Sequence, residues 1–240
     1  MIITTATDIG TRPYQEDRHC VYFHNNDIYL AVFDGHGGSK TVDTLRTEFP
    51  ALIERYTAPN SIDRNPVELL KTIHAVLDER TEDFEDGSTA SMGIITKDKV
   101  VLSVLGDSPI QAITTGPEPE VTLPDHNVRS NKIEHYEAIQ RGGTVLGGYL
   151  FDSKNIFGRG LQMSRAFGNV QLRAVLNQTP EIFVFDRALI KSLLIASDGI
   201  VDSSHSTAPF VLTKHCTAQE LVDSRKDIAF DNVTAIVVHF

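Results

Sequence analysis

The sequence contains the stretch IYLAVFDGHGG at residues 28–38, in which six apolar residues lead directly into a carboxylate and a glycine-rich turn. The apolar run is rich in β-branched and aromatic side chains, which is typical of a buried strand of this length. Asp34 therefore stands at a strand end. Gly35 follows it, and a glycine there allows the backbone to approach a ligand closely and to offer a carbonyl oxygen.

Acidic residues stand at the ends of other predicted strands as well. They are Glu16 and Asp17 before the strand at His19, Asp107 after 100–105, Asp198 after 193–197, and Asp231 before 233–240. One such residue is an ordinary turn residue, but the repetition indicates a common site. If these strand ends meet at one edge, the carboxylates converge and stay ionised only beside cations. Oxygen ligands select hard divalent ions such as Mg²⁺, Mn²⁺ or Ca²⁺.

The remaining sequence predicts an α+β fold, because many short strands alternate with a few helices. The predicted strands cover 2–7, 19–23, 28–33, 91–96, 100–105, 111–114, 182–185, 193–196 and 233–240. The predicted helices run from Ser39 towards Phe49, where Pro50 interrupts, from Pro66, from Ser130 to Arg141, and after Thr217. The nucleotide-binding patterns GxGxxG and GxxxxGK[ST] are both absent, which excludes the common nucleotide-binding folds.

The composition is that of an acidic globular protein. Asp and Glu number 32 against 22 Lys and Arg, a formal net charge of -10, which argues against a nucleic-acid or anionic-membrane partner. Hydrophobic residues make up 41%, enough for a core. Two cysteines without a CxxC pattern exclude a disulfide framework. With no signal-peptide pattern and no long apolar run, we expect a cytoplasmic protein, or a nuclear one in a eukaryotic cell.

A series of short motifs runs in order along almost the whole chain, from Ile9 to the C-terminus. They are Arg12-x-x-x-Glu16-Asp17, DGHGG at 34–38, GSTA at 87–90, GDS at 106–108, DH at 125–126, GG at 142–143, LQMSRAFG at 161–168, SDG at 197–199 with Asp202, and DN at 231–232. Together they resemble the metal-dependent protein phosphatases, the PPM or type 2C serine/threonine phosphatases. Asn169 departs from the family pattern, in which an Asp is common at that position.

The resemblance implies a four-layer α-β-β-α sandwich of two mainly antiparallel sheets flanked by helices. It implies a single phosphatase domain over residues 1–240, with a flap-like segment at about 125–160 beside the active site. It also implies phosphorylated proteins as substrates, and we expect a monomer.

The resemblance further implies a centre of two Mn²⁺ or Mg²⁺ ions and a third, weaker ion. Its implied metal residues are Asp34, bridging both ions, Gly35 through its carbonyl, Asp198 and Asp231 at one ion, Glu16 at the other through water, and Asp107 and Asp202 at the third. Asp17 would orient a metal-bound water, and the metal-bridging hydroxide would attack the phosphate.

The chemistry of phosphate ester hydrolysis gives two further residues a role. Arg12 can bind the phosphate, because a guanidinium matches phosphate geometry. His36 can act as the general acid for the serine or threonine oxygen, which is a poor leaving group. Two alternatives remain open: a pseudophosphatase that only binds phosphoproteins, and a hydrolase of small phosphoesters.

Overall fold

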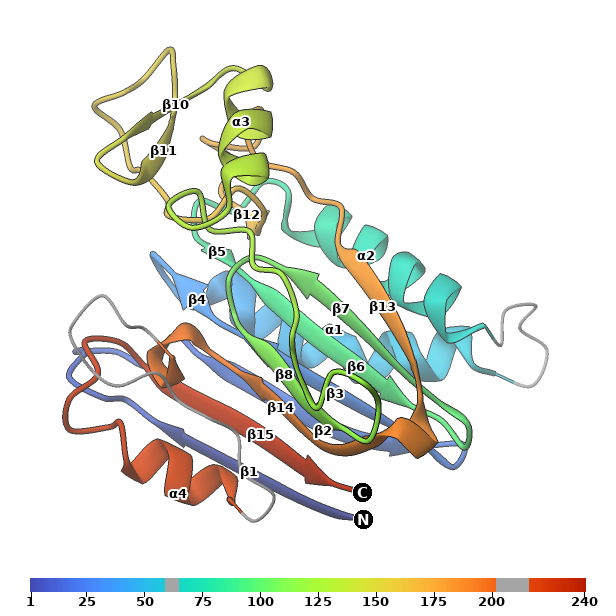
Figure 1. Ribbon diagram of the computed structural model, residues 1–240. Helices are drawn as coiled ribbons and strands as arrows, with labels where there is room; N and C mark the ends of the chain where they lie inside the picture. Colours follow the sequence, from blue (N-terminus) through green and yellow to red (C-terminus); the bar gives the residue numbers. More distant parts are fainter. Residues whose placement is uncertain (59–64, 202–215) are drawn as a thin grey trace.

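Two five-stranded antiparallel sheets form the centre of the computed structural model, which describes residues 1–58, 65–201 and 216–240 (Figure 1). The first sheet has the order β1 (Ile2–Asp8), β15 (Val233–His239), β14 (Ile190–Ala196), β8 (Ile110–Thr114), β9 (Glu120–Thr122). The second has the order β13 (Glu181–Asp186), β7 (Lys99–Leu105), β6 (Ala90–Ile95), β3 (Asp27–Phe33), β2 (Arg18–His24). Leu30 and Leu102 of the second sheet pack with Ile195 and Ile236 of the first in one buried core.

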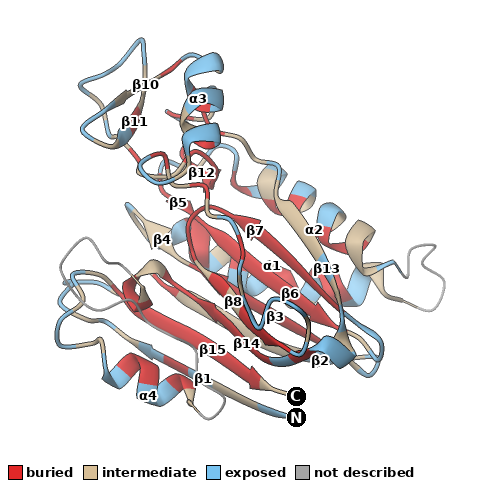
Figure 2. Cartoon of the chain, viewed as in Figure 1, coloured by how far each residue is buried: buried red, intermediate tan, exposed pale blue. Residues whose placement is uncertain are grey.

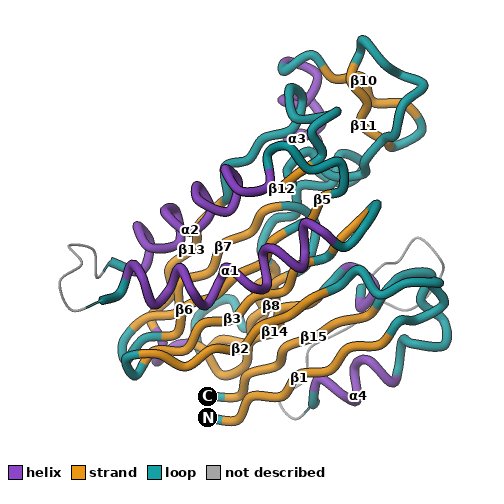
Figure 3. The backbone as a smooth tube through the Cα atoms, turned by 180° about the vertical axis from the view of Figure 1, so that it is seen from behind, coloured by secondary structure: helices purple, strands orange, loops and turns teal. Residues whose placement is uncertain are grey.

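Helices cover the outer faces of both sheets. α1 (Lys40–Tyr56) and α2 (Pro66–Thr81) lie across the second sheet, as Figure 3 shows from behind. α4 (Ala218–Asp223) packs on the first sheet through Leu221 and Val222. This arrangement confirms the predicted four-layer α-β-β-α sandwich. Among the described residues, none of the helices is both long and apolar enough to cross a lipid bilayer.

The helix boundaries follow the predicted capping residues, with one correction. Asn65 caps α2 by accepting a hydrogen bond from the Val67 amide at 2.9 Å, and Thr217 and Glu220 form a capping box at α4. The predicted break at Pro50 is wrong, because α1 continues through it to Tyr56. Beyond the proline, Leu52 and Ile53 are buried, and their packing offsets the backbone hydrogen bond that proline cannot donate.

Strand register explains why the acidic strand ends meet. In the second sheet, Arg18 at the start of β2 is opposite Phe33 at the end of β3. In the first sheet, Ala196 at the end of β14 is opposite Ala235 near the start of β15. The acidic segments that precede or follow these four strands therefore emerge at the same end of the sandwich. Three short strands that sequence patterns did not predict, β4 (Gly35–His36), β5 (Gly87–Ser88) and β12 (Phe167–Gly168), pair at this end.

The segment predicted as a flap stands at the end of the molecule away from the termini (Figure 1). It contains α3 (Lys132–Gln140) and the hairpin of β10 (Gly143–Leu146) and β11 (Tyr149–Asp152). Ala138, Leu150 and Leu161 form its small core together with Leu172 and Leu176, which lie beyond the predicted boundary. Most of its outer surface is exposed, whereas the inner strands β3, β6, β7, β8, β14 and β15 of the two sheets are mainly buried (Figure 2). Two short 3-10 helices, Arg187–Leu189 and Asp198–Ile200, complete the described elements.

Candidate active site

Asp34 lies within a group of carboxylates at the end of the sandwich where β3 and β14 finish. Its Oδ2 accepts a hydrogen bond from the Asp198 amide at 3.3 Å, and its own amide donates to Thr89 Oγ1 at 3.2 Å. Loss of hydration raises the pKa of Asp34 well above its usual range, and nearby carboxylates add to the shift. Those carboxylates belong to Asp198, Asp17, Asp231 and Asp107. The fold therefore brings together five of the acids that the sequence singled out.

Asp17 is the most buried acid of this group, with 3% of its surface exposed. Burial raises its pKa to about 7, hydrogen bonds from Ser197 and Thr234 oppose the shift, and the Asp231 charge adds to it. Its Oδ2 has no hydrogen-bond partner among the described residues. A buried carboxylate oxygen of this kind is costly unless a cation or a proton reaches it. The donor set is therefore suited to a hard divalent cation.

Glu16 is held against the glycine-rich turn that follows Asp34. Its Oε1 accepts a hydrogen bond from the Gly38 amide at 2.6 Å, and its own amide donates to Asn232 Oδ1 at 2.7 Å. A side chain at Gly35 would place its Cβ 2.5 Å from the Glu16 carbonyl oxygen. Glycine is therefore required at position 35 for Glu16 and the end of β3 to approach each other.

Arg12 reaches the same region from the N-terminal loop. Its Nη2 donates to Asp231 Oδ2 at 2.6 Å, and its Nε donates to the Phe230 carbonyl at 2.7 Å. The predicted phosphate-binding cation and a predicted metal ligand thus form an ion pair at the edge of the carboxylate group. Half of the Arg12 side chain is exposed, so the guanidinium is accessible to a ligand.

His36 lies on β4, two residues after Asp34. Its Nε2 is 3.0 Å from Asn169 Oδ1, and Asn169 Nδ2 donates to the Phe167 carbonyl. Burial lowers the pKa of His36 to about 4, and the Arg159 charge lowers it further, whereas the bond to Asn169 and the Asp86 charge oppose the shift. Asn169 therefore orients the imidazole. The sequence marked Asn169 only as a departure from a family pattern and gave no signal of this contact.

Asp107 is positioned by residues at the base of the flap. Its Oδ2 accepts a hydrogen bond from Asn127 Nδ2 at 2.8 Å. The preceding Gly106 exchanges two bonds with His126: the Gly106 amide donates to His126 Nδ1, and the His126 amide donates to the Gly106 carbonyl, both at 3.0 Å. The backbone of Gly106 has φ +107°, which explains the glycine. The predicted DH motif thus supports the predicted GDS turn.

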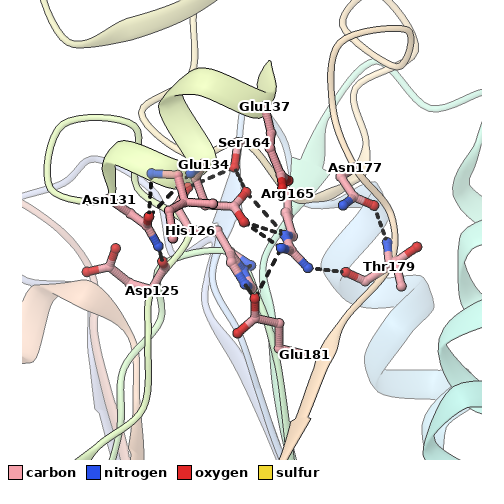
Figure 4. A network of polar contacts seen from close by, with 12 residues as sticks. Asp125, His126, Asn131, Glu134, Glu137, Ser164, Arg165, Asn177, Thr179 and Glu181 are labelled. Atoms are coloured by element: carbon pink, nitrogen blue, oxygen red, sulfur yellow. Dashed lines mark hydrogen bonds and ion pairs between the residues drawn. The ribbon is translucent and has the colours of Figure 1, made fainter. Parts of the chain in front are cut away.

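A buried ion-pair network ties the flap to the second sheet (Figure 4). Glu134 on α3 accepts hydrogen bonds from Arg165 and Ser164, and Arg165 Nη2 also contacts Glu181 Oε1 on β13 at 3.2 Å. His126 Nε2 lies 3.8 Å from the same Glu181 oxygen. Ligand atoms of His126, Glu134 and Glu181 lie within 4.8 Å of one another, a spacing that a metal could use. The Arg165 guanidinium already contacts both glutamates, so we interpret the cluster as an ion-pair network distinct from the predicted metal centre.

One predicted site residue lies outside the described part of the chain, and one residue that was not predicted lies close to the site. Asp202 lies outside the described residues, so its role at a third ion stays a prediction, as do the metal-binding roles of the other acids. Arg159, in the segment after β11, lies against Gly37, and sequence reasoning did not identify it. The nearest signal was its place within the flap-like segment.

The family of the chain follows from comparison with known proteins. The family model "Protein phosphatase 2C" matches residues 10–229, so the chain belongs to this family. A relative named "Probable protein phosphatase 2C 11" from Arabidopsis thaliana is 27% identical over 222 residues, covering 88% of this chain and 58% of the relative. "Probable protein phosphatase 2C 55" from Oryza sativa subsp. japonica is 28% identical over 250 residues, covering 96% of this chain and 64% of the relative. The chain thus spans less than two thirds of the length of these relatives.

The fold is shared with solved structures of phosphatases. The crystal structure of a serine-threonine phosphatase 2C from Toxoplasma gondii aligns with a TM-score of 0.73 at 23% identity, covering 99% of this chain and 94% of that one. At this identity, the likeness shows a common fold. It agrees with the two antiparallel sheets and flanking helices described above.

Proposed function

We propose that the chain is a Mg²⁺- or Mn²⁺-dependent phosphatase that hydrolyses phosphoserine and phosphothreonine in proteins. The observation that carries the proposal is the convergence of Asp17, Asp107, Asp198 and Asp231 around Asp34. Such a group of like charges at a partly buried site fits divalent cations. Membership of the protein phosphatase 2C family supports the reaction class.

The residues that would hold two ions are Asp34, the Gly35 carbonyl, Asp198, Asp231 and Glu16. Asp107 would serve a third, weaker site together with Asp202. When bound, the cations would supply positive charge that neutralises the phosphate and lowers the pKa of a water molecule. The hydrogen bonds from the Gly38 amide to Glu16 and from the Asp198 amide to Asp34 support this assignment, because they hold oxygen ligands close together without cysteine or histidine.

The remaining site residues would act on the substrate. Arg12 would leave its ion pair with Asp231 to bind phosphoryl oxygens in a bidentate manner. Asp17 would orient the attacking water. His36 would donate a proton to the departing serine or threonine oxygen. A phosphate dianion bound beside it would favour the imidazolium.

Metal-dependent turnover tests the proposal directly. Wild type and Asp34→Asn are assayed on a phosphothreonine peptide with Mn²⁺ and with excess chelator. We expect chelator to abolish turnover and Asp34→Asn to reduce it on the order of 100-fold or more, because the variant replaces the central carboxylate by a neutral amide. Mn²⁺ should also raise the thermal unfolding midpoint of wild type and raise that of Asp34→Asn much less.

A matched control separates this effect from loss of surface charge. Asp186→Asn alters an exposed aspartate at the end of β13, whose partner is Lys99, and should keep wild-type activity and the Mn²⁺-induced thermal shift. Turnover that resists chelator, or undiminished activity of Asp34→Asn, would contradict the proposed metal-dependent reaction. A normal Mn²⁺ shift without turnover of any phosphoester would instead support the binding-only alternative.

A further inference from the structure

Arg159 extends from the segment that follows β11 to the glycine-rich turn after His36. A Cβ built on Gly37 would lie 1.8 Å from Arg159 Nη1, 2.6 Å from Cζ and 2.9 Å from Nη2. These three distances mean that the guanidinium group, and not only its stem, lies on the Gly37 backbone. Gly37 has φ +80°, so glycine is favoured there by conformation as well as by this contact.

The position of Gly37 links Arg159 to the candidate active site. Its neighbours in the turn are His36, the predicted general acid, and Gly38, whose amide donates to Glu16 Oε1 at 2.6 Å. Gly37, Gly38 and Glu16 also line a cavity of about 680 Å³ together with Tyr14 and other residues of the N-terminal loop. Arg159 therefore presents a positive charge at the glycine-rich turn, between His36 and the contact of Gly38 with Glu16.

Among the described residues, Arg159 differs from the other two arginines near this cavity in having no hydrogen-bond or ion-pair partner. Arg12 is paired with Asp231 and the Phe230 carbonyl. Arg18 donates to Asp43 at 2.7 Å and to two backbone carbonyls. Arg159 is an exposed residue, and its guanidinium pairs with none of the described groups, although Glu16 is held at the same glycine-rich turn. An uncommitted guanidinium in this place is suited to a doubly charged anion.

We propose that Arg159 binds the phosphoryl oxygens of the substrate, as a second guanidinium in addition to Arg12. The inference rests on the proposed function, since it assumes a phosphate monoester at this site. A guanidinium donates two parallel hydrogen bonds to a phosphate, whereas the ammonium of a lysine acts as a single point of charge. Gly37 then serves as the support on which the flap residue reaches the phosphate.

Kinetics of Arg159 variants test the proposal. Wild type, Arg159→Ala and Arg159→Lys are compared on para-nitrophenyl phosphate and on a phosphothreonine peptide with Mn²⁺. We expect Arg159→Ala to lower kcat/KM about 10-fold on both substrates, because the phosphoryl group is common to them. Arg159→Lys should recover part of the loss. Calorimetry on the Mn²⁺-loaded protein should show that inorganic phosphate binds most tightly to wild type, less tightly to Arg159→Lys and most weakly to Arg159→Ala.

The control variant is taken from the same flap-like segment as Arg159. Arg129→Ala removes another exposed flap arginine, which contacts Gln162 and Tyr149, and should leave kinetics and phosphate binding unchanged. Equal thermal midpoints would show that each variant is folded. Phosphate affinity of Arg159→Ala equal to that of wild type, or a kinetic loss confined to the peptide, overturns the proposal. Absence of turnover in wild type would count against the proposed function, while the calorimetric comparison would still decide the role of Arg159.

Discussion

At the residue scale, the pair of His36 and Asn169 offers a sharp test of acid catalysis. His36→Gln should reduce turnover of a phosphothreonine peptide on the order of 100-fold, since an alkoxide leaves poorly without a proton. The loss on para-nitrophenyl phosphate should be much smaller, because its aryl oxide leaves without assistance. Steady-state kinetics on both substrates provide the measurement.

Asn169→Ala serves as a companion variant. Its turnover should also fall more on the peptide than on para-nitrophenyl phosphate, but the loss should be smaller than for His36→Gln, because Asn169 only orients the ring. Equal losses on the two substrates would rule out His36 as the acid.

The acids at strand ends were predictable from the sequence because local pattern and strand period determine where each strand stops. The run before Asp34 and the run before Asp198 each end where the structure ends β3 and β14. Contacts between residues distant in the chain were not predictable in this way. Asn169 contacts His36, which lies 133 positions earlier in the chain, and Arg159 contacts Gly37, which precedes the flap-like segment. Such contacts depend on the pairing of β4, β5 and β12 and on where the segment after β11 lies, which no local pattern encodes.

At the element scale, the flap is held by a buried ion pair whose loss should destabilise it. Glu134 is 2% exposed, and Glu134→Ala would leave the Arg165 charge buried without its main partner. We expect the variant to lose about 3 kcal/mol of unfolding free energy and to exchange amide hydrogens faster in β10 and β11 than in β15. Glu137→Ala, on the same helix but half-exposed and 3.7 Å from Arg141, should change stability by less than about 0.5 kcal/mol. Similar effects from the two variants would refute this account of the network.

The elements that sequence reasoning placed poorly share a physical cause. The helix through Pro50 continues because Leu52 and Ile53 are buried beyond it, so tertiary packing outweighs the local preference. The two-residue strands β4, β5 and β12 have no periodicity to detect, and they exist only because three distant segments meet at the site. Long strands with continuous apolar runs, by contrast, were placed within one residue at each end, except that β14 begins three residues before its predicted start, since burial on both faces leaves a strong pattern.

At the scale of the whole molecule, buried titratable groups make stability depend on pH in opposing directions. Burial lowers the pKa of His36 and His126 to about 4 and that of His74 to about 3. These histidines bind protons more readily when unfolded, so acid destabilises the fold through them. Asp17, whose pKa is raised to about 7, acts in the opposite direction, because its folded form takes up a proton first as the pH falls. A variant comparison at one histidine is needed to separate these contributions.

His74 is the suitable histidine, because it lies on α2 against β7, with Nε2 3.0 Å from Ser103 Oγ and its ring 5.5 Å from that of Phe167. Its stabilising contribution is fully present above a pH of about 6.5 and declines as the pH falls towards about 3. Between pH 7 and pH 5, wild type should therefore lose about 2 kcal/mol through this residue. Urea unfolding of His74→Phe at both pH values should show that its unfolding free energy falls between pH 7 and pH 5 by about 2 kcal/mol less than that of wild type. Ser103→Ala keeps the imidazole, so it should be destabilised at both pH values while retaining the wild-type pH dependence. If His74→Phe shows the same change between the two pH values as wild type, the buried imidazole does not control the acid sensitivity of the sandwich.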